Sequence, residues 1–281
     1  MSLLDRVRDC AGYDLAGYVP FRVEGAEVGR IRRDVVDLFR PYDEVLAVSE
    51  TGIDFISRYR TVDARTKALS LILEDLRTRG HVPGWRDEPY PVGVGFNQPV
   101  LLEMERAAVP LFGVRGYGVH MNGWLIRGGQ MHMWIAKRSM TKPTGPGKLD
   151  QMVAGGQPTG LSLRDNMIKE CGEEAGLPFE IAKNVQPVGT ISYCTERSEG
   201  LRQDVLFNFD LEVPDDFEPV NVDGEVEAFM LWPIDEIIAR LSNTDDFKFN
   251  SALVIIDFLI RRGFIEADDP DYADIVAGLH A

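Results

Sequence analysis

The spacing of apolar and polar residues divides the chain into a mixed first part and a strand-rich second part. Between residues 64 and 79, apolar side chains recur every three to four positions and a glycine follows, which predicts an amphipathic helix. Further periodic segments cover 28–38 and 53–59, and the proline- and glycine-rich stretch 83–95 indicates turns and short strands. The buried face of the predicted helix should carry Leu69, Ile72, Leu73 and Leu76.

The second part of the chain predicts a mixed sheet flanked by helices. A sheet covered by helices is the economical way to bury such segments, so we expect an α+β fold. Glycines cluster between 111 and 118, where we place the boundary between an N-terminal α+β domain, 1–115, and a larger domain, 116–281. The predicted strands are 118–127, 131–138, 185–193, 204–212 and 225–233, and the predicted helices are 234–241, 251–262 and a short one within 268–281.

A double glycine followed by a short acidic helix is the most informative feature of the sequence. Ser162 is a suitable N-cap with Asp165 three residues later, and Gly176 is a suitable C-terminal stop, so we expect a helix between them. Its apolar arc should face a core and consists of Met167, Ile168, Cys171 and Ala175.

Three carboxylates of this helix, Glu170, Glu173 and Glu174, fall within one narrow arc at about 100° per residue. Like charges repel one another unless a cation lies between them. Mg²⁺ and Mn²⁺ take oxygen ligands and keep positions for water and phosphate oxygens. We therefore expect a divalent metal site here, and the glycine turn lets the backbone carbonyl of Gly156 approach it. A solvated acidic helix face is the alternative.

The same segment resembles the Nudix box, which reads Gly, five residues, Glu, seven residues, Arg-Glu, an apolar residue, any residue, Glu-Glu, any residue, Gly and an apolar residue. Two positions depart, because Leu161 replaces the first Glu and Lys169 replaces the Arg, so the ion pair of the pattern cannot form. The resemblance implies a metal-dependent diphosphohydrolase with a Nudix α/β/α sandwich. The matching residues are Gly155, Glu170, Cys171, Glu173, Glu174, Gly176 and Leu177.

A longer resemblance, over both predicted domains, is to the Nudix proteins related to thiamine pyrophosphokinase, which carry an extra N-terminal domain. It implies hydrolysis of thiamine diphosphate, or of its oxidised or damaged analogues, to the monophosphates. The positions that carry it are 84–88, 105–107, 117–123, 137–139, 142, 147, 149–150, 153–156 and 223–227.

Charged residues on both sides of the box are candidates for substrate and metal binding. Lys137, Arg138 and Lys142 precede the glycine turn and are predicted to bind phosphate oxygens, with a solvated charge run as the alternative. Glu225 and Glu227 should face one side of a strand. We expect Glu225 to act as a metal ligand or as the base for the attacking water, and we place Glu227 beside the substrate.

Aromatic side chains and one histidine complete the predicted site. Trp85, Tyr117 and Tyr193 are candidates for stacking on a flat heterocycle, together with Arg86, although packing in a core is the common role of aromatic residues. His120 is a candidate phosphate contact, and a structural role in a hydrogen bond is favoured for it.

Composition excludes some partners. The net charge of −15 argues against nucleic acid and against anionic membranes, since both would be repelled. The three cysteines lack metal-ligand spacing, and the N-terminus lacks the apolar run of a signal peptide, so we expect a cytoplasmic location. The expected partner is a small-molecule diphosphate, and a homodimer is left open.

Other functions remain as alternatives to a thiamine diphosphatase. A general nucleoside-diphosphate-type pyrophosphatase comes first. An isoprenoid diphosphate isomerase is next, because the loop 142–147 resembles one in those enzymes, but the segment 150–156 lacks the Cys and His of that chemistry. A non-catalytic binding module is supported only by Leu161 and Lys169.

Overall fold

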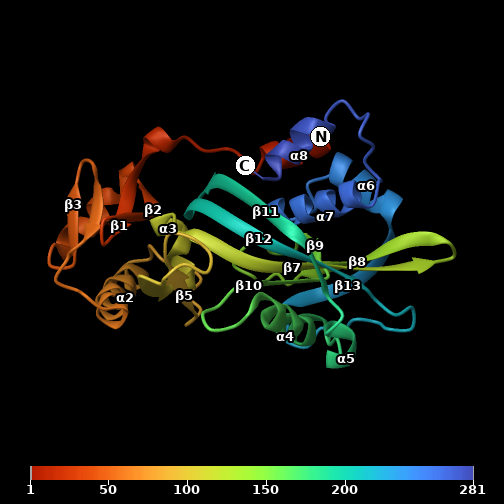
Figure 1. The fold of residues 1–281 in the computed structure, drawn as a ribbon, viewed down its shortest axis with the longest axis horizontal. Coiled ribbons are helices and arrows are strands. Elements are labelled where there is room, and N and C mark those ends of the chain that lie inside the picture. The colour runs from red at the N-terminus through yellow and green to blue at the C-terminus, as the bar shows by residue number, and fades with distance from the viewer. Residues whose placement is uncertain (1, 281) are drawn as a thin grey trace.

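The computed structural model describes residues 2–280, and its two larger sheets lie in two bodies that pack side by side (Figure 1). The N-terminal body holds a four-stranded sheet in the order β2-β1-β4-β3 and a separate hairpin of β5 and β6. Its strands are β1 Tyr18–Val23, β2 Ala26–Arg32, β3 Leu46–Ser49, β4 Gly52–Phe55, β5 Pro89–Val92 and β6 Leu102–Glu105; its helical segments are η1 Leu15–Gly17, η2 Arg33–Tyr42, α2 Val62–Thr78, η3 Arg106–Ala108 and α3 Val109–Phe112.

The helix α2 is the amphipathic helix that the sequence predicts. Thr61 caps its N-terminus, and Gly80 follows its end with a φ of +81° that favours glycine. The four predicted apolar residues are buried in one core with the four-stranded sheet and the β5–β6 hairpin. The N-terminal body therefore has its own hydrophobic core.

The larger body is built on a seven-stranded mixed sheet in the order β11-β12-β7-β8-β13, with β10 on β7 and β9 on β8. The long strand β7 pairs in parallel with β12, and its other edge pairs first with β10 and then with β8. The two short strands β9 and β10 were not predicted from the sequence. The strands are β7 Arg115–Arg127, β8 Gln130–Arg138, β9 Leu149–Gln151, β10 Val153–Gly156, β11 Gln186–Arg197, β12 Gly200–Glu212 and β13 Val226–Pro233.

Helices cover both faces of this sheet, which confirms the predicted α+β fold with an α/β/α sandwich (Figure 1). On one face, α6 Ile234–Asn243, α7 Phe249–Arg261 and α8 Tyr272–Gly278 build one core. On the other face, α4 Leu163–Ala175 and α5 Phe179–Ala182 build a second core. Within residues 2–280, no helix is long and apolar enough to cross a membrane.

The first helix, α1 Leu3–Arg8, does not pack with the N-terminal body. Its residues Leu4 and Val7 are buried in the core formed by α6, α7 and α8. The two ends of the chain therefore lie near each other (Figure 1). The division into 1–115 and 116–281 stays a prediction, and α1 is an exception to it.

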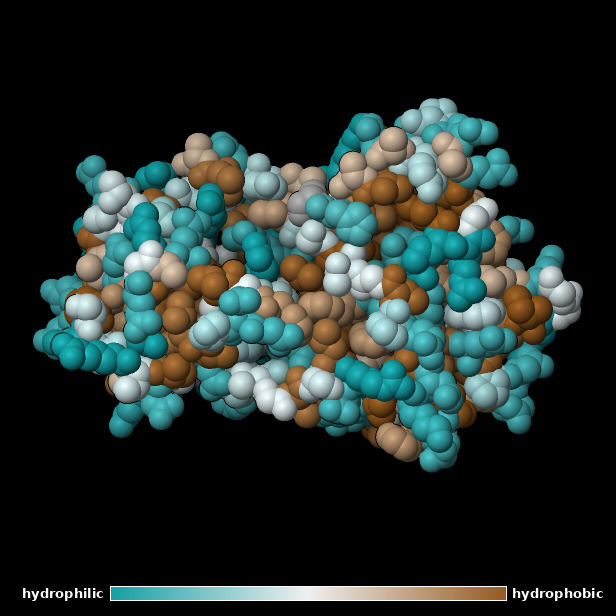
Figure 2. All heavy atoms as spheres, in the orientation of Figure 1, coloured by the Kyte–Doolittle hydropathy of each residue, from teal (hydrophilic) through white to brown (hydrophobic). Residues whose placement is uncertain are grey.

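The two bodies are joined by backbone and side-chain contacts beside β7. The hydroxyl of Tyr90 on β5 bonds to both the N–H and the C=O of Tyr117 on β7. Gln203 on β12 donates to the carbonyl of Gly113 at 2.9 Å. On the face shown in Figure 2, hydrophilic residues dominate at both ends, and hydrophobic residues are more frequent in the middle.

Candidate active site

The acidic helix α4 forms as the sequence predicts. The Ser162 hydroxyl accepts from the Asp165 N–H at 3.1 Å, and Gly176 ends the helix in the left-handed conformation with φ 64°. Met167, Cys171 and Ala175 are buried against the sheet, and Ile168 packs beside them. The apolar arc thus fixes which residues face β10.

The three carboxylates of α4 do not converge on one point. Glu174 is buried, and its Oε2 accepts from the Ala154 N–H at 2.8 Å. Glu170, one turn earlier, lies against Gly155, where a Cβ would come within 2.3 Å of the Glu170 Cδ. Glu173 instead lies towards solvent, with its Oε2 2.5 Å from the Lys169 Nζ.

A different set of carboxylates does converge. Oxygens of Glu174, Asp223 and Glu225 lie within 4.8 Å of one another. A cavity of about 10 Å³ lies between Glu174 and Glu225, with Arg138 and Asp150 also in its wall. Its volume is close to the minimum for one water molecule. Hard oxygen donors around a space of this size fit a divalent cation, and Asp223 was not predicted as a member of the group.

The ionisation of these carboxylates depends on a cation. Burial raises the pKa of Glu174 well above its ordinary value, and the neighbouring Glu170 and Asp150 carboxylates raise it further. Burial also raises the pKa of Glu170. For Glu225, burial opposes ionisation, but the hydrogen bond and charge of Lys142, a hydrogen bond with Glu174 and the charge of Arg86 together lower the pKa. A bound divalent cation would supply the charge that keeps Glu174 ionised.

The prediction that Glu225 and Glu227 face the same side is wrong. The pairing of β13 with β8 shifts register between Val226 and Ala228, so the strict alternation of side chains is interrupted. Glu225 forms an ion pair with Lys142 inside the site. Glu227 instead pairs with Lys137 at 3.0 Å on the exposed surface. Glu227 and Lys137 therefore both lie outside the walls of the cavities beside the site.

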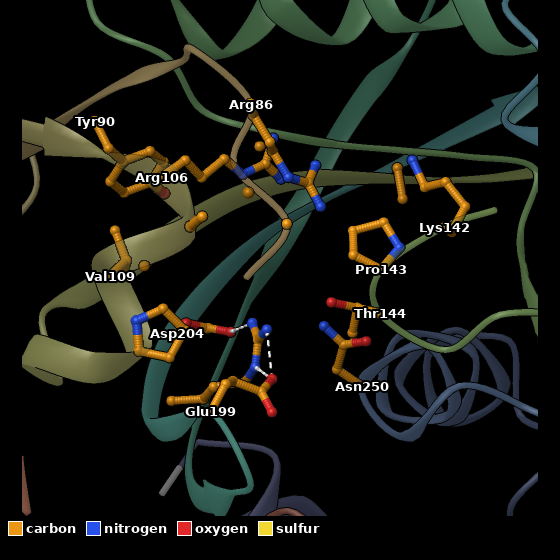
Figure 3. A pocket seen from close by; sticks show the side chains of 18 of the residues that line it. Arg86, Tyr90, Arg106, Val109, Lys142, Pro143, Thr144, Glu199, Asp204 and Asn250 are labelled. Atoms are coloured by element: carbon orange, nitrogen blue, oxygen red, sulfur yellow. Dashed lines mark hydrogen bonds and ion pairs between the residues drawn. The ribbon is translucent and has the colours of Figure 1, made fainter. Parts of the chain in front are cut away.

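A second, larger cavity of about 340 Å³ opens beside the carboxylates, between the two bodies (Figure 3). Cations are concentrated in its wall, although the chain as a whole carries a net charge of −15. Carboxylates also occur, at Glu199 and Asp204. The cations of the wall are Arg86, Arg106, Arg138, Lys142, Arg202 and Lys248.

Two of these cations come from the N-terminal body. Arg106 follows β6 and forms an ion pair with Glu88 at 2.9 Å. Arg86 lies nearby, and among residues 2–280 no carboxylate lies within ion-pair distance of its guanidinium. Burial lowers the pKa of Arg86, and the adjacent Arg106 lowers it further. Guanidinium groups in this arrangement suit the oxygens of a phosphate.

The glycine turn has a structural role that the sequence did not indicate. A Cβ at Gly156 would come within 2.4 Å of the Arg106 Cζ, so a glycine here leaves room for that guanidinium. The Gly156 carbonyl accepts from the Asn166 amide at 2.8 Å. The glycine therefore leaves room for Arg106, and the approach of its carbonyl to a metal stays a prediction.

Two predicted basic residues hold the loop 139–148 against the site. Arg138 pairs with the buried Asp150 at 2.7 Å and donates to the carbonyl of Thr144 at 2.8 Å. Lys142 lies in that loop, where its ammonium reaches Glu225. Arg138 thus positions the loop, and Lys142 presents its charge to the cavity.

Of the predicted ring contacts, only Tyr117 borders the cavity, where it packs against Phe96 at 5.2 Å between ring centroids. Trp85 lies outside it, under the guanidinium of Arg77 at 4.7 Å from the ring centroid. Tyr193 is buried, and its hydroxyl donates to Asp204 at 2.5 Å. The structure thus places Trp85 and Tyr193 outside the cavity wall, and the stacking roles stay predictions.

His120 also reaches the cavity wall, but it is neutral. Its Nδ1 lies 2.9 Å from the Gln151 Oε1. Burial, with a smaller contribution from the nearby Lys248 ammonium, lowers its pKa to about 4. This matches the structural role favoured from the sequence, since a neutral ring offers little to a phosphate.

Several residues of the site were not predicted. They are far from the acidic helix in sequence, and only the tertiary structure brings them to the site. Asp223 could have been found from the sequence, because it directly precedes Gly224 and the predicted site residue Glu225. The missed residues are Arg106, Arg202, Asp204, Asp223, Lys248 and Asn250.

Comparison with known proteins identifies both parts of the chain. Residues 117–253 match the NUDIX domain, and residues 2–116 match a domain of unknown function, DUF4743. The chain is 43% identical over 270 residues to "Nudix hydrolase 20, chloroplastic" of Arabidopsis thaliana, covering 93% of this chain and 72% of that protein. It is 40% identical over 278 residues to "Nudix hydrolase 24, chloroplastic" of the same plant, covering 98% and 76%.

Among solved structures, a MutT/nudix family protein from Enterococcus faecalis aligns with a TM-score of 0.43 and 13% identity. The alignment covers 58% of this chain and 67% of that one.

Proposed function

The chain belongs to the Nudix hydrolase family, whose members act on nucleoside diphosphate derivatives, and we propose that it hydrolyses the diphosphate of a small substrate held in the cavity between its two bodies. The observation that carries this proposal is the opposition of charges in the cavity. The buried Glu174 of α4 and the less buried Asp223 and Glu225 before β13 converge beside the cavity, and cations from both bodies line its wall.

We infer that Mg²⁺ or Mn²⁺ binds at the carboxylates. Glu174, Asp223 and Glu225 offer the converging oxygens, and Glu170 lies close enough to Gly155 to complete the site from α4. Glu173 is kept as a further candidate, although its carboxylate pairs with Lys169 in this structure. A bound divalent cation would supply a water of lowered pKa and offset phosphate charge.

The cationic side of the cavity then holds the phosphate oxygens. Arg86 and Lys142 present charges into the cavity, and Arg106 lies beside the glycine turn. Held there, a diphosphate would have one phosphorus near the carboxylates and the other near the guanidinium groups. One of the carboxylates can also accept the proton of the attacking water, and Glu170 and Glu225 are the candidates for this base.

We propose thiamine diphosphate, or an oxidised or damaged analogue, as the substrate, with the monophosphate as the product. The resemblance over both parts of the chain supports this choice. The cavity of about 340 Å³ is at the small end of ligand pockets, which favours a compact head group over a dinucleoside polyphosphate. A general nucleoside diphosphate pyrophosphatase is the alternative.

A substrate panel tests the proposal. The purified chain is incubated with Mg²⁺ or Mn²⁺ and, separately, thiamine diphosphate, an oxidised analogue, ADP-ribose, a nucleoside diphosphate and a dinucleoside tetraphosphate, and monophosphate or phosphate release is measured. The proposal requires the highest kcat/KM for a thiamine-type diphosphate. Comparable values for ADP-ribose would leave the general pyrophosphatase, and no release from any compound with either metal would contradict the diphosphohydrolase itself.

A further inference from the structure

The cavity has a second end, away from the proposed metal ligands Glu174, Asp223 and Glu225. There the side-chain oxygen of Asn250 is a buried acceptor that receives no hydrogen bond. Asn250 is the second residue of α7, it is 6% exposed, and it lines the cavity. Among the residues that the structure describes, none donates to its Oδ1. A buried acceptor without a partner is costly, so a ligand or water is expected to bind it.

The orientation of the Asn250 amide is fixed by its neighbours. The Tyr193 hydroxyl donates its single proton to the Asp204 Oδ2 at 2.5 Å, because a carboxylate only accepts. The same hydroxyl can then only accept, and it does so from the Asn250 Nδ2 at 3.1 Å. The chain Asn250–Tyr193–Asp204 therefore places the amide nitrogen towards Tyr193 and leaves the Oδ1 for another donor.

Further acceptors lie at the same end. Glu199 and Asp204 line the cavity, and Arg202 pairs with Glu199 at 2.8 Å and with Asp204 at 3.7 Å (Figure 3). The two carboxylates and the Asn250 Oδ1 offer several acceptors at this end, beside the cations Arg202 and Lys248. This end of the cavity is thus suited to a group that donates hydrogen bonds.

The two ends are a short distance apart. Along β7, Gly116 pairs with Asp204 and Gly118 pairs with Gly156. Two residues along a strand and two steps across the sheet separate Asp204 from Gly156, which is about 12 Å between their backbones. A diphosphate joined to one or two small rings spans such a distance.

We propose that Asn250 is a specificity-determining residue that accepts a hydrogen bond from an N–H group, such as a ring amine, on the non-phosphate part of the substrate. This deepens the proposed function and depends on it, because the phosphates must lie at the carboxylate end. Asp204 and Glu199 are further acceptors in the same part of the wall, and Tyr193 keeps the Asn250 amide in the accepting orientation.

The test compares matched substrates on the full chain. The first pair is thiamine diphosphate and the analogue with hydrogen in place of the 4-amino group of its pyrimidine. The second pair is adenosine diphosphate and purine riboside diphosphate, which differ in the same way. In Asn250→Leu, which keeps the shape but neither donates nor accepts, kcat/KM for the amine-bearing member should fall about tenfold while the partner is unchanged.

Asn122→Leu is the matched control. Asn122 is also buried and also has an orphan Oδ1, but it donates to Asp210 outside the cavity, so its loss should change both members of a pair equally. An equal change for both members in Asn250→Leu would overturn the proposal, as would a preference below twofold in the unaltered chain. If Asn250→Leu does not fold, Asn250→Asp keeps an acceptor and must keep the preference.

The outcome also separates this inference from the substrate assignment. If neither thiamine compound is hydrolysed but the adenosine pair is, the thiamine assignment fails, and the amine preference within the adenosine pair still decides the role of Asn250. If no compound is hydrolysed, calorimetric binding of the same pairs replaces kcat/KM, and equal affinities within each pair would contradict the role.

Discussion

The carboxylate side and the arginine side of the cavity are built in opposite ways. Glu170 and Glu174 are one turn apart on a single capped helix, and their direction follows from the apolar arc of that helix. Arg86 and Arg106 flank the β5–β6 hairpin of the N-terminal body, and they reach the site only because that body packs beside β7.

The two sides also differ in how their charges are compensated. The carboxylates are buried among like charges, so the pKa of Glu174 is raised and a cation is needed. Arg106 is paired with Glu88, whereas Arg86 forms no ion pair within residues 2–280 and lies between the cations Arg106 and Arg138 and the carboxylates Glu88 and Glu225. The carboxylate side thus suits a metal ion, which the arginines would repel. The arginine side suits a phosphate, which the carboxylates would repel.

The largest effect is expected on the carboxylate side. Glu174→Gln keeps the shape but removes a charge that the cation needs, so kcat should fall roughly a hundredfold or more, as for loss of one strong electrostatic stabiliser. Steady-state kinetics at saturating Mg²⁺ measures this. Glu173→Gln is the matched control, and its loss should be smaller because that carboxylate is half exposed and paired with Lys169. Equal losses would show that both glutamates bind the metal.

A smaller effect is expected on the arginine side. Arg86→Ala should raise KM for every diphosphate about tenfold with a smaller change in kcat, since one charge-assisted contact to phosphate is removed. Arg77→Ala in the same body is the control, because Arg77 stacks on Trp85 outside the cavity. An unchanged KM in Arg86→Ala would separate the N-terminal body from phosphate binding.

Between the two sides, Lys248 gives a dependence on pH. Burial lowers its pKa from 10.5 to about 8, with Arg138, Arg202 and Lys142 opposing its charge and Asp150 favouring it. Lys248 is therefore cationic below pH about 8 and neutral above it. We expect kcat/KM for a diphosphate to fall several-fold as the pH rises through that value. In Lys248→Met, kcat/KM should be lower at neutral pH and should not decline as the pH rises. If the variant kept the full decline, a group other than Lys248 would be responsible for the pH dependence.

The smallest effect is expected from restoring the ion pair of the Nudix pattern. In Leu161→Glu combined with Lys169→Arg, the free energy of unfolding should change by no more than about 1 kcal/mol, as for an exposed ion pair. Activity should be preserved. Thermal or denaturant unfolding and kcat measure the two quantities, and a tenfold rise in kcat would show that the absent pair limits the enzyme.

Much of the fold could be predicted from local patterns. The helix α2, the capped helix α4 and the long strands of the second sheet follow from the spacing of apolar residues and from their caps, because these signals act over a few residues. The short strands β9 and β10 were missed, since three or four residues give too little alternation to detect. The bulge that separates Glu225 from Glu227 had no local signal at all.

For the site, the sequence by itself determined α4 and its apolar face, since caps and an apolar arc set the bounds and the direction of a helix, whereas the contact of Glu174 with β10 came from the tertiary structure. It also indicated Lys142 and Glu225, which a resemblance over many residues identified. Only the tertiary structure decided that Arg106 lies over Gly156, that Trp85 and Tyr193 are kept from the cavity, and that Asn250 is turned by Tyr193. These contacts join residues far apart in the chain, and packing between elements decides them.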